Sequence, residues 1–97
     1  MAVESRPSFA VGEATVAAAG TPVQLPGMAV GQGCELVVKA KKSNQGAIKV
    51  GQSSAEALAG KFILDPNEGV KLRIDNASKV WIDAEISGDK ASLIVEQ

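Results

Sequence analysis

A two-residue alternation of apolar and polar side chains runs through the second half of this sequence and constrains its fold more than any other feature. Residues 70–75 and 80–86 each carry an apolar side chain at every second position, and residues 93–95 continue the pattern. This is the period of a strand that has one face in a core and the other face in solvent. Trp81 falls on the outer face of the second stretch, so its large ring is expected to point away from the core.

Further strands are predicted along the chain by short β-branched and aliphatic runs that end at glycine, proline or polar residues. One segment has helical character instead, because Ser53 or Ser54 can cap its start and Gly60 can end it. A loop is the alternative there. The predicted strands, besides those named above, cover residues 9–18, 22–26, 35–40, 47–51 and 62–64.

The connections carry turn residues that predict hairpins. A polar turn at residues 41–46 indicates a hairpin over residues 35–51. Residues 65–69 place proline at the second position of a type I turn and Gly69 at a left-handed position. Residues 76–79 and 87–90 form two more turns, and both Gly88 and Asp89 can adopt positive φ in the second of them.

Short strands about ten residues apart, with almost no helix, are typical of two packed sheets. The sequence therefore predicts an all-β fold: a compact, jelly-roll-like two-sheet β-sandwich with 7–8 short antiparallel strands and at most one short helical turn. Residues 9–97 form the single domain, and residues 1–8 form an N-terminal arm that includes Arg6 and Pro7. Either a neighbouring subunit or the chain's own sheet could hold this arm.

Catalytic and metal-binding chemistry finds little support in the composition. The chain has no histidine, which removes the commonest general base and metal ligand, and its one cysteine, Cys34, reads as a small buried filler. Asp75, Asp83 and Glu85 lie on strand faces that also carry lysine or arginine, so they are expected to form a solvated ladder of charge pairs. We therefore expect no catalytic residues, no cofactor and no metal site.

The charge balance argues against a nucleic-acid partner, because 10 basic residues face 11 acidic ones. No apolar run approaches the ~20 residues that span a bilayer, and neither a membrane nor a small-molecule ligand is expected. Lys41 and Lys42 sit in a lysine-rich segment that reads first as a solubilising edge and second as a protein contact. The candidate protein-interface residues are Trp81, Arg6, Pro7, Phe9, Lys41 and Lys42; for Trp81, burial under a loop or between two covered faces is the alternative.

Several of these segments resemble a group of small β-sandwich virion accessory proteins of tailed bacteriophages. The resemblance extends from about residue 12 to residue 95, and its motifs are structural rather than chemical. They comprise residues 12–16 (GEATV), 20–25 (GTPVQL), 36–41 (LVVKAK), 48–51 (IKVG), 72–76 (LRIDN) and 80–84 (VWIDA). Trp81 stands where such proteins often have a smaller aromatic residue.

The resemblance implies a non-enzymatic virion protein, most simply a capsid decoration or cement protein that bridges capsid subunits. Its partners would be the major capsid protein and copies of itself, and it would act on the capsid surface after assembly in the cytoplasm of the host bacterium. A head-to-tail or tail accessory subunit is one alternative. A carbohydrate-binding module for host-surface attachment is another, although one tryptophan and no tyrosine offer little surface for stacking sugars.

Overall fold

The computed structural model describes residues 8–97 and shows two antiparallel sheets packed face to face, which confirms the predicted all-β, two-sheet fold. Its one α-helix and one 3-10 turn are short. In chain order the elements are β1 (Phe9–Thr15), β2 (Val23–Gln24), β3 (Leu36–Ala40), β4 (Ile48–Gly51), α1 (Ser54–Ala59), β5 (Phe62–Leu64), β6 (Gly69–Leu72), η1 (Ala77–Lys79), β7 (Trp81–Ala84) and β8 (Lys90–Glu96).

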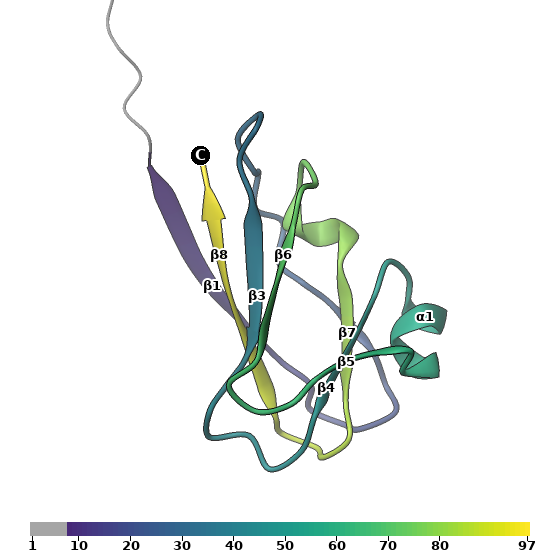
Figure 1. Cartoon of the computed structure of the whole chain (residues 1–97). Helices are drawn as coiled ribbons and strands as arrows, with labels where there is room; N and C mark the ends of the chain where they lie inside the picture. The colour runs from purple at the N-terminus through teal and green to yellow at the C-terminus, as the bar shows by residue number, and fades with distance from the viewer. Residues whose placement is uncertain (1–7) are drawn as a thin grey trace, which may run out of the picture.

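The strand order is that of a jelly roll. Sheet A has the order β1-β8-β3-β6, and sheet B has the order β2-β7-β4-β5. The first strand thus pairs with the eighth, the second with the seventh, the third with the sixth and the fourth with the fifth. Such nested pairing describes one long hairpin rolled up into two sheets, which is how jelly rolls are built. In Figure 1 sheet A lies on the left, sheet B lies to its right, and α1 lies beyond sheet B.

The turn residues correctly indicate where the chain reverses direction, but they do not indicate which strands pair. The hairpin over residues 35–51 was wrong, since β3 lies in sheet A and β4 in sheet B. The turn at residues 65–69 likewise crosses from β5 in sheet B to β6 in sheet A. A loop of a few residues easily spans the ~10 Å between packed sheets, so turn chemistry alone cannot distinguish a hairpin from a crossing. Within residues 8–97 the consecutive strands that do pair are β4 and β5, which α1 connects.

Two details of turn geometry also differ from expectation. In the turn after β5, Glu68 N–H donates to the carbonyl of Asp65 (2.9 Å), and the left-handed residue is Asn67 (φ 76°) rather than Gly69. Asparagine tolerates this conformation because its short side chain can bond locally. In the turn before β8, Gly88 has positive φ (92°) as expected, whereas Asp89 does not.

The helix prediction is confirmed at both ends. The Ser53 hydroxyl accepts a hydrogen bond from Glu56 N–H, and Gly60 closes α1 in the left-handed conformation (φ 66°). α1 packs on the outer face of sheet B at Gly51, where a β-carbon would come within 2.5 Å of Ala57 N. Glycine is needed here because the helix backbone passes directly over the strand.

The core between the sheets is built from aliphatic side chains that point inward from every second strand position. In β3, for example, Leu36, Val38 and Ala40 are fully buried, while Val37 and Lys39 point outward. Alternation on both sheets thus reproduces the period seen in the sequence. None of the helices among residues 8–97 is long and apolar enough to cross a membrane.

Candidate interaction surface

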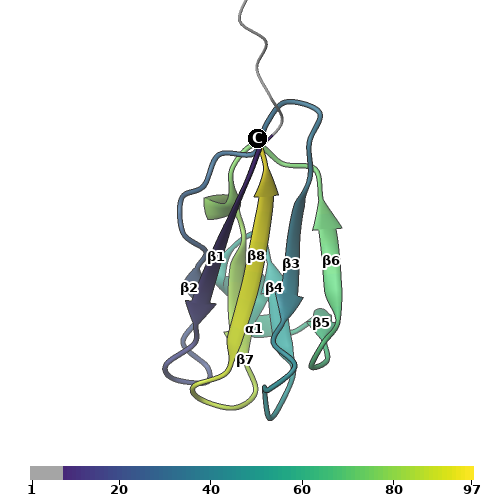
Figure 2. The same cartoon turned by 90° about the vertical axis from the view of Figure 1, so that its left-hand side faces the viewer.

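The outer face of sheet A carries an apolar strip that the described residues leave uncovered. Val11, Ile94 and Val37 stand side by side across β1, β8 and β3, and Phe9 lies one row further along β1. Phe9 is 66% exposed and Val11 is 69% exposed. Figure 2 looks onto this face, and no helix or loop of the described chain crosses it. Exposed apolar side chains that lie together in this way indicate a contact surface. We call these four residues the sheet A strip.

Charged side chains border the sheet A strip. At the Thr15 end of β1, Glu13 pairs with Lys41, and the Lys90 ammonium lies 3.8 Å from the same carboxylate. The hydrogen bond from Lys41 is the main reason that the pKa of Glu13 lies below its ordinary value. At the Phe9 end, Glu96 stands opposite Phe9 in the neighbouring strand. The strip therefore has an acidic end and a more basic end.

The predicted interface residues divide between regions of the molecule. Phe9 belongs to the sheet A strip, whereas Lys41 lies at the opposite end of the same face, beside Glu13. Lys42 is exposed in the loop after β3. Arg6 and Pro7 lie outside the described residues. The structure brings Phe9, Lys41 and Lys42 to one sheet, but not to one contact patch.

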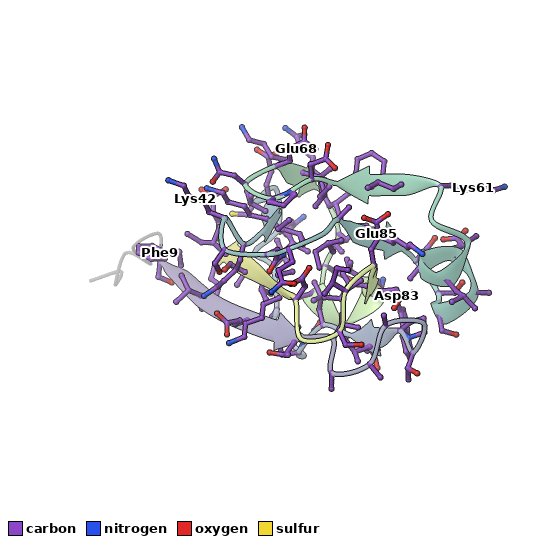
Figure 3. All side chains as sticks on the ribbon, turned by 90° about the horizontal axis from the view of Figure 1, so that it is seen from below. Phe9, Lys42, Lys61, Glu68, Asp83 and Glu85 are labelled. Carbon is purple, nitrogen blue, oxygen red and sulfur yellow. The ribbon has the colours of Figure 1, made fainter. Side chains whose placement is uncertain are left out.

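Trp81 faces outward, as the alternation predicts, but on sheet B. It stands opposite Gly51 in β4 and Gln24 in β2, next to the position where α1 packs onto the sheet, and it is half-buried. The helix thus shields part of this face. In Figure 3 Phe9 lies on the left, on the side of the molecule away from Lys61 and α1. Trp81 and the sheet A strip consequently cannot form one continuous surface.

Two carboxylates, Asp83 and Asp89, are buried, although the amino-acid composition does not distinguish them from exposed carboxylates. Asp83 is fully buried, and its Oδ1 accepts a hydrogen bond from Gly20 N–H (2.9 Å), so the solvated ladder was wrong at this position. Its other oxygen, Oδ2, has no partner among the described residues. Asp89 accepts from the N–H groups of Gln45 (3.1 Å) and Gly46 (2.8 Å). Both carboxylates accept hydrogen bonds from loop backbone N–H groups at the end of the sandwich where the chain passes from β7 to β8.

Of the three carboxylates predicted to form charge pairs, Asp75 stays in solvent and does so. The Lys79 ammonium lies 2.8 Å from Asp75, one helical turn away in the sequence, and the hydrogen bond between them is the main cause that lowers the pKa of Asp75. Glu85 is also exposed, and its Oε1 accepts from Ala47 N–H (3.0 Å). Among residues 8–97 no group of three or more histidine, cysteine, aspartate or glutamate side chains is placed to hold a metal ion.

Between β5 and β6 the two sheets part, and a half-open apolar cavity of about 310 Å³ enters the core. The alternation in the sequence did not predict this cavity, because the cavity lies where the edge strands of the two sheets, β5 and β6, approach each other without pairing. Its lining includes the polar residues Gln52 and Lys79. The apolar side chains that line it are Val50, Phe62, Val70, Leu72, Ile74 and Val80.

Comparison with known proteins adds no relative: neither a protein-family model, nor a curated protein, nor a solved structure matches the chain. The function is therefore inferred from the surface and from the chemistry of the described residues.

Proposed function

We propose that this chain is a non-enzymatic structural protein of a bacteriophage virion, a capsid decoration or cement protein that docks on the capsid through the sheet A strip. The observation that carries the proposal is the exposure of Phe9 and Val11, about two-thirds each, on a sheet face that the described chain leaves bare. Isolated exposed apolar residues are ordinary, but two of them beside the half-buried Ile94 and Val37 on the same sheet face favour a protein contact.

The jelly-roll topology is compatible with this proposal. Jelly rolls occur in viral capsid proteins and also in lectins and cupins, so the fold alone does not select a function. The resemblance of residues 12–95 to virion accessory proteins favours the first of these classes. Binding would come from many copies, each of which makes a small apolar contact with the major capsid protein.

The exposed polar residues around the sheet A strip suit this mode of binding. Phe9 and Val11 supply the apolar centre, and Glu13, Lys39 and Glu96 form the charged border. Interfaces between separately folded proteins typically have such an apolar centre and polar rim. The copies would be found on the outer capsid surface, assembled in the bacterial cytoplasm.

Binding to capsids tests the proposal directly. Purified particles are stripped of the chain and incubated with the wild type, with Phe9→Ser/Val11→Ser, or with Leu58→Ser. Leu58 is the matched control, because it is 50% exposed on α1, on the sheet B side of the molecule. We expect the wild type and Leu58→Ser to bind and the double variant to lose binding. Binding by the double variant at wild-type level would reject the sheet A strip as the docking face.

Copy number distinguishes the proposed role from the head-to-tail or tail alternative. Quantitative mass spectrometry of intact particles should find the chain in a number comparable with the major capsid protein if it decorates the capsid. A neck or tail subunit would instead appear in the small number set by the axis it occupies. Absence from purified particles would overturn both roles.

A further inference from the structure

The four strands at the edges of the two sheets differ in how well they are protected against pairing with another strand. β2 has two residues and is flanked by Pro22 and Pro26, neither of which can donate a ladder hydrogen bond. β5 has three residues. β6 carries Lys71, and Arg73 follows it. Short length, proline and charge are the usual means of keeping an edge from pairing.

β1 has none of these protections. It is seven residues long, and the stretch from Ser8 to Thr15 contains neither proline nor lysine. Its register with β8 runs from Phe9↔Glu96 to Thr15↔Lys90 without a bulge that would bend the edge away. Its single charge, Glu13, is already paired with Lys41.

The free hydrogen-bonding groups of β1 can be assigned from the bonds at its two ends. Gln97 N–H donates to the carbonyl of Ser8 (2.7 Å), and Val16 N–H donates to the carbonyl of Asp89 (3.0 Å). Residues of an antiparallel strand alternate between bonding to one neighbour and facing the other side. The even-numbered residues therefore bond to β8, and the odd-numbered residues direct their N–H and C=O groups to the open edge: Phe9, Val11, Glu13 and Thr15.

We propose that this edge is occupied by β1 of a second copy of the chain, antiparallel and related by a two-fold axis that passes beside Gly12. This register places Phe9 opposite Thr15 of the partner and Val11 opposite Glu13 of the partner. It engages every odd-numbered residue of both strands. An axis at Glu13 would instead bring two like carboxylates together, and an axis at Val11 would leave Thr15 without a described partner.

Charge complementarity favours a second copy in this orientation. The row across sheet A at one end of β1 contains Phe9, Glu96 and Glu35, and the row at the other end contains Thr15, Lys90 and Lys41. The two-fold axis continues the acidic row of one copy into the basic row of the other. Three strand spacings separate Glu96 from the partner's Lys90, roughly 14 Å, which exceeds the ~8 Å screening length, so the charges set orientation more than affinity.

Edge pairing leaves the sheet A strip free. The backbone bonds lie in the plane of the sheet, whereas Phe9 and Val11 project from its outer face, so two copies would join into one continuous sheet with a doubled apolar strip. The inference adds self-association to the proposed function, and its structural basis is β1 alone. A monomer in solution would overturn the pairing. Capsid docking through the sheet A strip is tested separately, by the capsid-binding experiment.

Sedimentation equilibrium of the full chain tests the pairing, with Val11→Pro and Val37→Lys as matched variants. Proline at position 11 removes an edge N–H that makes no bond with residues 8–97, whereas Val37 lies on the same outer face two strands from the edge. We expect a dimer for the wild type and Val37→Lys and a monomer for Val11→Pro, with circular dichroism to confirm that the variant is folded. If the proline variant does not fold, Val11→Glu replaces it, because it would place two carboxylates opposite each other in the pairing. A monomeric wild type, a dimeric Val11→Pro, or equal dissociation by Val37→Lys would each overturn the proposal.

Disulfide trapping tests the register independently. Phe9→Cys and Thr15→Cys are made separately in a Cys34→Ser background, which removes the one native cysteine. After oxidation of the mixture we expect a disulfide between the two variants, because these positions face each other across the pairing. Neither variant should cross-link with itself, since the two copies of each position lie about 20 Å apart along the strands. A cross-link within one variant, or none in the mixture, would reject this register.

Discussion

The outer faces of the two sheets differ in how each is covered. On sheet B, α1 packs over Gly51, the loop before β2 donates Gly20 N–H to the buried Asp83, and Trp81 is half-covered. On sheet A, Phe9 and Val11 stand in the open. Sheet B is covered only in part, because Ile63 of β5 remains 46% exposed, whereas no described helix or loop crosses the outer face of sheet A. The comparison shows that a helix of the same chain covers part of sheet B; under the proposed function, sheet A is covered by another molecule instead.

The largest expected effect comes from uncovering sheet B. In Gly51→Val the new β-carbon would lie 2.5 Å from Ala57 N and 2.7 Å from the carbonyl carbon of Glu56, so α1 must move away. Overpacking of this kind costs up to about 3 kcal/mol of unfolding free energy. Urea denaturation measures the loss. Gly27→Ala is the control, because no atom lies within 4 Å of its added β-carbon; equal destabilisation by both would contradict a covered sheet B.

Adjacent valines in β3 compare the two sides of sheet A. Val38 is fully buried and Val37 is half-buried on the outer face. Val38→Ala should lower the unfolding free energy by about 2 kcal/mol, and Val37→Ala by well under about 1 kcal/mol, because little apolar area is lost from the exposed side. Thermal and urea unfolding would measure both losses, in the Val11→Pro background that is expected to be monomeric. A larger loss at Val37 would mean that this face is packed within the chain.

Filling the cavity between β5 and β6 should have a smaller and opposite effect. Val70→Leu adds a methylene to the wall of the 310 Å³ cavity without reaching the sheet A strip. We expect a gain of about 0.5–1 kcal/mol in unfolding free energy, typical of cavity filling. Differential scanning calorimetry would record a higher Tm. A fall in Tm would show that the cavity walls are already closely packed.

The charged border of the strip gives the smallest effect and a defined pH dependence. The pKa of Glu13 is lowered mainly by the hydrogen bond from Lys41, so the pair contributes stability above the ordinary glutamate pKa and loses it as the pH falls through the lowered value. Lys41→Met should move the Glu13 pKa upward in an NMR titration of the side-chain carboxyl carbons. Asp75, which pairs with Lys79, serves as the internal reference and should not move.

Much of the fold follows from local sequence, because alternation and caps act over a few residues. The strand positions, the aliphatic core, and the Ser53 and Gly60 caps of α1 are all recovered from the sequence. Strand pairing is not recovered, because the same turn residues serve a hairpin and a crossing between sheets. Only the long-range pairings, such as β1 with β8, decide between them.

The surface was harder to predict than the fold. Phe9 was recognised as an interface candidate, but Val11 and Val37 were not, since an apolar residue in a strand reads equally well as core. Asp83 was predicted to be solvated because the outward strand faces also carry lysine and arginine, whereas the loop that contacts it lies 63 positions earlier in the chain. Contacts between such distant segments leave no local signal.

The nested strand order also governs when this protein can fold during its synthesis. β8 lies between β1 and β3 and holds both of them in sheet A, yet it is made after seven other strands. A ribosome-bound chain that ends before Lys90 has no central strand for that sheet, and its first strand has no partner on either side. Sheet A therefore cannot be completed before β8 is translated, and until then its unpaired strands and exposed apolar side chains favour aggregation.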